Sequence, residues 1–197
     1  MIRLGITGGI GVGKSYVSDV FNKMGILVYD SDAKAKELMA TDQSMISDIK
    51  ELLGNQAYNE EGLDREYIAT KVFNNQVLLE KLNEIVHPIV YANFQAWAVE
   101  QKQALVIQES ALLLQRGNKK GLDKLLLVEA PLDTRISRVL SRDPFRTREE
   151  IMSIIEKQTY REEVQKLIDY TIVNDNISPL LSELVRIKED LELTSFT

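Results

Sequence analysis

The strongest chemical signal in the sequence is a glycine-rich run close to its start. Residues 8–15 read Gly-Gly-Ile-Gly-Val-Gly-Lys-Ser and fit the pattern G-x-x-x-x-G-K-[ST] without a gap. Glycines let backbone N–H groups turn toward phosphate oxygens, the lysine of such a loop reaches the outer phosphates, and the final hydroxyl binds Mg²⁺. The sequence therefore predicts a loop that binds a nucleotide with Mg²⁺. Contacts are expected from Gly8, Gly9, Ile10, Gly11, Val12, Gly13, Lys14, Ser15 and Tyr16.

Polar side chains that suit phosphate chemistry follow four of the apolar runs in the chain. They are Thr7 after the first run, Asp30 and Asp32 after the second, Glu109 after the third, and Asn174 with Asp175 after the last. In an open α/β sheet, ligands collect beyond the carboxyl ends of the strands. Phosphoryl transfer needs a carboxylate that orients the nucleophile and another near the metal ion. We therefore expect these residues to surround the phosphates.

Two of these carboxylates have a predicted role, and each has a structural alternative. Asp32 is the predicted catalytic base, with Asp30 as its competitor, although Asp32 also stands where it could cap a helix that begins at residue 33. Glu109 follows an apolar run, as does the acid that helps to bind Mg²⁺ in phosphate-loop proteins, so it is a candidate metal ligand beside Ser15. Its alternative is a strand-end charge that faces solvent.

Arginines cluster between two expected helices in the last third of the chain. Arg135, Arg138 and Arg142 are spaced by three and four residues and share one helix face. The proline-containing segment that follows is expected to form a lid over about residues 142–150, which would bring Arg142 to the transferred phosphate. Arg135 is expected to lie on a solvated face.

The sequence contains no cysteine and a single histidine, His87. Thiol nucleophiles, iron–sulfur clusters and cysteine-ligated zinc sites are therefore excluded. His87 precedes Pro88 at the predicted end of a helical run. A lone histidine on an apolar face is more often a packed core residue than a ligand contact, so its position alone does not assign it a role.

The elements that would position these residues alternate between strands and helices. Apolar runs at residues 2–6, 26–29, 104–107, 124–128 and 171–173 predict strands. Residues 33–103 show only helical periodicity, with an apolar face that ends at Pro88 and no convincing strand. We therefore predict an α/β fold, in which residues 1–32 and 104–197 form a mostly parallel five-stranded sheet with helices on both faces, and residues 33–103 form a helical insertion.

Composition narrows the function classes further. The chain has 197 residues, of which 44% are hydrophobic and 27% charged, and its formal net charge is −6. A protein that clamps nucleic acid usually carries a basic excess, so no nucleic-acid partner is expected. No apolar run approaches the length of about 20 residues that crosses a membrane. We expect a cytoplasmic protein without membrane contact, as a monomer or weak homo-oligomer.

Taken together, these residues resemble the dephospho-CoA kinase family. The resemblance spans nearly the whole chain and is carried by Thr7 to Ser15, Asp30-Ser31-Asp32, His87-Pro88, Arg138 to Arg142-Asp143, Gln158 and Asn174-Asp175. It implies the P-loop kinase fold, with a nucleotide-binding core, a helical CoA-binding insertion and a lid. It also implies that the chain uses ATP to phosphorylate the ribose 3′-hydroxyl of dephospho-CoA, the last step of coenzyme A synthesis.

The resemblance also implies roles for individual residues, and alternative functions remain. Asp32 matches the base of the family, with Thr7 beside it, Arg142 matches the lid arginine, and His87 lies in the segment that lines the CoA side. Substrate contacts are expected from Thr7, Asp30, Asp32, His87 and Glu109, and further ATP contacts from Arg142 and Asn174.

Gln115 and Tyr16 depart from the usual pattern of the family, which has an acid at the first of these positions and a threonine at the second. Another small-metabolite kinase, or an ATP-binding switch without an acceptor, is the alternative.

Overall fold

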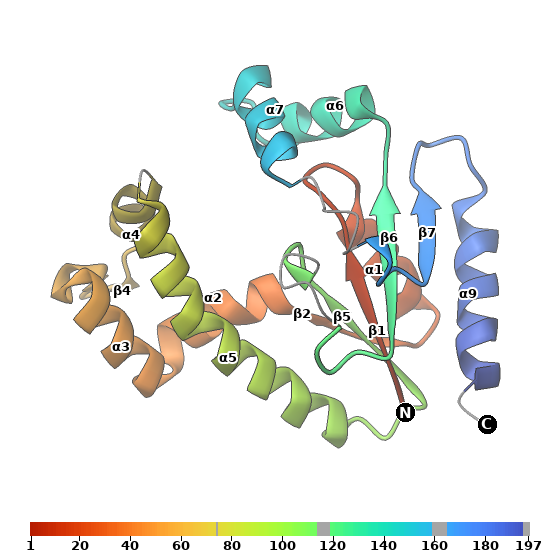
Figure 1. The fold of residues 1–197 in the computed structure, drawn as a ribbon, viewed down its shortest axis with the longest axis horizontal. Helices are drawn as coiled ribbons and strands as arrows, with labels where there is room; N and C mark the ends of the chain where they lie inside the picture. The colour runs from red at the N-terminus through yellow and green to blue at the C-terminus, as the bar shows by residue number, and fades with distance from the viewer. Residues whose placement is uncertain (74, 114–118, 159–164, 195–197) are drawn as a thin grey trace. The chain divides into compact units, whose positions relative to one another are not determined.

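The computed structural model describes residues 1–73, 75–113, 119–158 and 165–194, and Figure 1 shows their helices and strands. The chain divides into two compact units, one of Met1–Asp30 with Gln101–Thr197 and one of Ser31–Glu100. The sequence predicts these boundaries at residues 32 and 103. The structure therefore assigns Asp32 to the second unit.

The first unit is built on a parallel sheet of five strands. They are β1 (Ile2–Thr7), β2 (Leu27–Asp30), β5 (Leu105–Glu109), β6 (Lys124–Glu129) and β7 (Tyr170–Val173), in the spatial order β2-β5-β1-β6-β7. Central strands of a parallel sheet are covered on both faces, which explains why β5 and β6 each contain an unbroken apolar run, residues 105–107 and 125–128. The predicted α/β fold with a five-stranded parallel sheet is confirmed.

The two faces of the sheet have different covers. Leu126 and Val128 of β6 belong to a core shared with helices α1 (Lys14–Lys23) and α9 (Leu180–Thr194). Leu125 and Leu127 of the same strand face the other way. On that face, the described residues that cover them are Leu113, Leu122, Leu167 and Ile168.

Helices α6 and α7 of the first unit form a hairpin at the region where the lid is predicted. Helix α6 spans Leu132–Arg142 and α7 spans Arg148–Lys157. A capping box begins α7, in which Glu150 N donates to Thr147 Oγ1 at 3.2 Å and Thr147 N donates to Glu150 Oε2 at 2.9 Å. The buried side chains that join the two helices are Ile136, Val139 and Ile151.

The second unit is a group of helices around α5. Its elements are α2 (Ser31–Thr41), α3 (Gln43–Leu53), η1 (Asn55–Ala57), β3 (Tyr58–Asn59), β4 (Gly62–Leu63), α4 (Arg65–Phe73) and α5 (Gln76–Glu100). Helix α5 packs against α2, α3 and α4. Its buried positions recur every fourth residue and are Leu82, Val86, Val90, Phe94 and Ala98.

Two predictions for this unit are wrong. The expectation of no strand misses the antiparallel pair β3–β4, in which Tyr58 faces Leu63 and Asn59 faces Gly62. Strands of two residues are too short to produce a period-two pattern in the sequence. The expected helix end at Pro88 is also wrong, because α5 continues through it to Glu100. Packing of the buried positions on both sides of Pro88 outweighs a cost of about 3 kcal/mol for proline inside a helix.

Helix α2 begins at Ser31, two residues before the predicted start. Asp32 therefore lies in the first helical turn rather than at the capping position that the sequence suggests as its alternative role. A carboxylate in the first turn interacts favourably with the positive end of the helix dipole. Across the described ranges, no helix is both long enough and apolar enough to cross a membrane.

Candidate active site

The glycine-rich loop connects β1 to α1 and takes a conformation that depends on its glycines. Gly13 immediately precedes α1 with φ of 88°, in the left-handed region that other residues rarely adopt. A Cβ at this position would lie 2.3 Å from Asn174 Nδ2. Because of both constraints, glycine is required where the loop meets the helix.

Lys14 carries a positive charge into the curve of this loop. Its Nζ donates hydrogen bonds to Gly8 O at 2.9 Å and to Gly9 O at 3.3 Å. Lys14 is also the first residue of α1, so its charge adds to the positive end of that helix dipole. Helix N-termini with this geometry bind phosphate groups. The loop therefore has the charge and the backbone shape of an anion-binding site.

Ser15 and Glu109 meet beside the loop. Ser15 Oγ donates to Glu109 Oε1 at 3.0 Å, and Glu109 is 8% exposed. They come together because β5 pairs with β1, where Glu109 is opposite Ile6. Mg²⁺ prefers oxygen ligands and is usually bound by one or two protein groups plus nucleotide phosphates. A hydroxyl and a carboxylate at this distance fit that requirement. No cluster of three or more acidic or histidine side chains that could hold a metal alone occurs among the described residues.

The carboxyl ends of β1, β2 and β5 form one edge of the sheet. Glu109 is paired in register with Asp30 on β2, and Thr7 is the last residue of β1. Asp30 is exposed. Thr7 is fully buried, and its Oγ1 makes no hydrogen bond within the part of the chain that the structure describes. The structure therefore brings three residues of the predicted site to the same edge.

Asn174 connects the end of β7 to the phosphate loop. This buried residue donates from Nδ2 to Val12 O at 2.9 Å and accepts at Oδ1 from Arg138 Nη2 at 3.2 Å. Arg138 also donates to Val12 O at 3.2 Å and to Asn176 Oδ1 at 2.6 Å. The sequence predicts Asn174 as a site residue. It does not predict Asn176, because a helical or strand period carries no information about a connecting loop.

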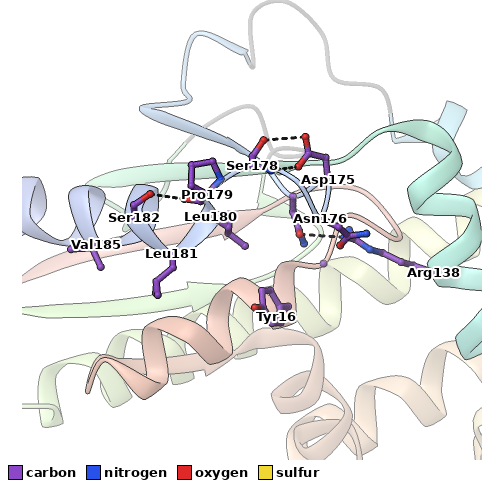
Figure 2. A pocket seen from close by; sticks show the side chains of 12 residues that line it. Tyr16, Arg138, Asp175, Asn176, Ser178, Pro179, Leu180, Leu181, Ser182 and Val185 are labelled. Carbon is purple, nitrogen blue, oxygen red and sulfur yellow. Dashed lines mark hydrogen bonds between the residues drawn. The ribbon is translucent and has the colours of Figure 1, made fainter.

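A cavity of about 1030 Å³ opens beside these residues. Figure 2 shows Arg138 and Asn176 at one end of its lining and Leu181 and Val185 of α9 toward the other, with Tyr16 of α1 below them. The Tyr16 side chain, where the sequence departs from the usual threonine, is 59% exposed. A mostly apolar cavity with a few polar groups is typical of a small-molecule site. It suits the planar base of a nucleotide whose phosphates bind the loop.

Asp175 shapes the loop that borders this cavity. Its Oδ1 accepts from Ser178 N at 2.7 Å and from Ile177 N at 2.9 Å. The same two N–H groups lower the pKa of the Asp175 carboxyl. The carboxylate is therefore engaged by its own loop rather than directed to a ligand.

The three arginines on α6 have different surroundings. Arg142 is exposed, and its side chain makes no hydrogen bond or ion pair with any residue in the described ranges. The predicted solvated face is wrong for Arg135, because its Nε donates to Ile10 O at 2.9 Å. Helical spacing indicates which residues share a face, but it does not indicate what that face packs against. The contact of Arg135 with the phosphate loop had no separate signal in the sequence.

Two predicted residues belong to the second unit. Asp32 is exposed in the first turn of α2, and His87 is partly buried on α5. Gln115 lies outside the described residues. The structure thus gathers the nucleotide and metal candidates in the first unit, and leaves the roles of Asp32 and His87 as predictions.

Comparisons with known proteins agree on one family. The sequence model of the family described as dephospho-CoA kinase matches residues 2–179. A dephospho-CoA kinase of Bacteroides fragilis strain YCH46 is 34% identical over 187 residues, which cover 94% of this chain and 91% of that protein. A dephospho-CoA kinase of Porphyromonas gingivalis is 34% identical over 189 residues, with coverage of 96% and 94%.

Solved structures show the same fold. A protein from Thermus thermophilus has a TM-score of 0.80 and 32% identity, covering 100% of this chain and 98% of its own. Dephospho-CoA kinase from Campylobacter jejuni has a TM-score of 0.62 and 22% identity, with 96% of each chain covered. Shikimate kinase from Acinetobacter baumannii, at a TM-score of 0.55 and 14% identity, covers 100% of this chain and 96% of its own and is similar in fold alone.

Proposed function

This chain belongs to the dephospho-CoA kinase family, and we propose on that premise which of its residues bind the two substrates and transfer the phosphate. The family transfers phosphate to a hydroxyl of dephospho-CoA and uses ATP, so the predicted kinase activity is confirmed. The ribose 3′-hydroxyl is the proposed acceptor. The observation that best supports the proposed site is the meeting of Ser15 and Glu109 at 3.0 Å beside the loop that carries Lys14.

The phosphates of ATP are proposed to bind the loop from Gly8 to Ser15, with the base in the cavity next to Asn174. Three features support this placement: the dipole of α1, the charge of Lys14, and a cavity that begins at Gly13, where loop and helix meet. Ser15 and Glu109 are the proposed Mg²⁺ ligands. When bound, the ion supplies charge neutralisation at the phosphate oxygens.

Asp32 is the proposed base, and Asp30 remains its competitor. In the proposed reaction, the carboxylate accepts the proton of the substrate hydroxyl while that oxygen attacks the γ-phosphorus of ATP. The bond to the bridging oxygen breaks, and ADP leaves with the electron pair. Lys14 and the exposed Arg142 are proposed to stabilise the negative charge that develops on the transferred group.

The dephospho-CoA side of the site is proposed to include Thr7 and His87. Thr7 supports this with a buried hydroxyl that makes no hydrogen bond in the described ranges, since such a group gains free energy from a ligand that pairs with it. His87 is supported by the family resemblance and by its partial exposure on α5. A cytoplasmic location and a monomeric or weakly oligomeric state stay predictions.

Comparison of Asp32→Asn with Asp30→Asn tests the assignment of the base. We expect Asp32→Asn to lower kcat by about 10²-fold to 10⁴-fold, because it removes the proton acceptor, with ATP affinity nearly unchanged. Asp30→Asn is expected to have the smaller effect. The reverse order would transfer the role to Asp30. Equal, small effects of both would contradict a carboxylate base at this position and favour an ATP-binding switch.

A further inference from the structure

We propose that Arg135 and Gln158 are positioning residues that fasten the phosphate loop at Ile10 to the α6–α7 hairpin. The inference rests on the proposed binding of the ATP phosphates to this loop. Its elements all belong to the first unit. It gives a role to a glutamine that follows α7 and to an arginine that the sequence places on a solvated face.

Both backbone groups of Ile10 are held by side chains from the hairpin. Arg135 Nε donates to Ile10 O at 2.9 Å. Ile10 N donates to Gln158 Oε1 at 2.7 Å. This N–H therefore turns toward the hairpin, and the donors for the phosphates come from other residues of the loop. Since each residue has one backbone N–H and one C=O, and here both are bonded to the hairpin, the two contacts together fix the orientation of the chain at Ile10.

The side chain of Ile10 makes a third contact with the same hairpin. It packs against the buried core of α6 and α7, which consists of Ile136, Val139 and Ile151. Apolar packing holds the loop against the hairpin without fixing its rotation, whereas the two hydrogen bonds are directional. The combination specifies one position for the loop.

Two glycines that the phosphate-loop pattern does not require are explained by this packing. Gly9 and Gly11 occupy positions of the pattern where any residue is allowed. A Cβ at Gly9 would lie 2.3 Å from Arg135 Nη2 and 3.0 Å from Gln158 Oε1. A Cβ at Gly11 would lie 2.5 Å from Arg135 O. The absence of side chains at both positions thus lets α6 lie directly against the loop.

The same contacts link the loop to Arg142. Arg135 and Arg142 are seven residues apart on α6, which places them about two turns apart on the same side of one helix. A loop fastened at Arg135 therefore holds a defined position relative to the helix that carries Arg142. Loss of the fastening is expected to impair alignment of the transferred phosphate more than binding of dephospho-CoA.

The first test compares Gln158→Met with Gln158→Glu. Methionine keeps the length of the side chain and removes the acceptor for Ile10 N, whereas glutamate keeps an acceptor oxygen. We expect Gln158→Met to lower kcat/KM for ATP by about tenfold, with KM for dephospho-CoA within about twofold of the original value. Gln158→Glu is expected to recover most of the loss. Gln165→Met, at an exposed glutamine seven positions further along the chain, is the matched control and should have no effect.

A double-mutant cycle between Gly9→Ala and Arg135→Ala provides a second test. In the original protein, the added Cβ must displace the Arg135 guanidinium, so Gly9→Ala is expected to lower kcat/KM for ATP as Arg135→Ala does. In the Arg135→Ala background the same change should cost less than about twofold, because the closest atom in its way is gone and only Gln158 Oε1, at 3.0 Å, remains nearby. Independent effects that multiply would overturn the proposal.

Thermal melting separates positioning from folding. A normal kcat/KM in Gln158→Met, or a loss that follows the melting temperature and is not recovered by Gln158→Glu, would overturn the role of Gln158. Inactivity of the original protein toward dephospho-CoA would instead contradict the proposed function. Lys14→Ala distinguishes the two results, since it should lower kcat by about 10³-fold even if Gln158→Met leaves it normal.

Discussion

The two ends of the parallel sheet carry similar polar side chains and use them differently. At the amino ends of β6 and β7, the Asp169 carboxylate accepts hydrogen bonds from Leu125 N at 2.8 Å and from Lys119 Nζ. At the carboxyl ends, Thr7 Oγ1 is buried without a hydrogen-bond partner in the described ranges, and the Glu109 carboxylate contacts the loop hydroxyl of Ser15. The Asp169 carboxylate at one end is bonded within the fold, whereas the Glu109 carboxylate at the other is proposed to bind Mg²⁺.

Among substitutions that compare the two ends of this sheet, the largest effect is expected at the carboxyl end, for Lys14→Ala. Loss of the ammonium group should lower kcat for CoA formation by about 10³-fold, because it stabilises charge that develops in the transition state. Lys124→Ala, at the opposite end of the sheet, is the matched control and should change kcat less than about twofold. Steady-state assays of ADP release measure both. Similar kinetics for the two variants would remove the distinction between the ends.

Glu109→Gln is expected to have the next largest effect. Amide oxygen is a weaker Mg²⁺ ligand than carboxylate, so turnover should fall by about 10²-fold and require more Mg²⁺ for half-maximal rate. Glu129→Gln is a close control, because Glu129 is also the last residue of a strand in this sheet but is exposed. An unchanged Mg²⁺ requirement in Glu109→Gln would contradict the proposed metal site.

Asp169→Asn should affect stability and leave activity within about twofold. Burial raises the pKa of Asp169, but hydrogen bonds from Lys119 and Leu125 and the charges of Lys119 and Lys124 outweigh it, so the pKa is lowered overall. We expect the substitution to decrease the free energy of unfolding by about 2 kcal/mol near neutral pH.

The pH dependence of this difference follows from the lowered pKa of Asp169. The ionised carboxylate stabilises the folded state above the ordinary value of 3.8, and this contribution is lost as pH falls through the lower folded value. Urea unfolding of both proteins between pH 3 and pH 7 measures this contribution. These limits lie about one unit below and about three units above 3.8. A difference that persists in full at the acidic limit would contradict the ionic origin.

Sequence patterns predicted the parts of the molecule that depend on local residue types. The glycine-rich loop, the apolar strands and the polar residues at strand ends each have a physical cause within a few residues. The Ser15–Glu109 contact follows from two of these features, once β5 is known to pair with β1. Their role in binding a metal stays a prediction.

What the sequence did not predict depends on contacts between distant segments. Helical spacing predicts a solvated face for Arg135, because it carries no information about the loop, 125 residues away, that Arg135 contacts. The sequence predicts a helix end at Pro88, because the packing that carries α5 through it comes from three other helices. The part of the cavity lining formed by Leu181 and Val185 also cannot be predicted without the fold, since an exposed apolar residue has no distinctive signal in the sequence.

The acceptor specificity of the purified protein tests the proposed phosphate transfer directly. ADP release from MgATP should be measured with dephospho-CoA, AMP, adenosine and shikimate as separate acceptors, together with the amount of CoA formed. We predict that dephospho-CoA alone stimulates ADP release and that CoA appears in equal amount. Equal, slow ADP release with every acceptor, without CoA, would contradict the assignment of the polar strand ends to this phosphate transfer.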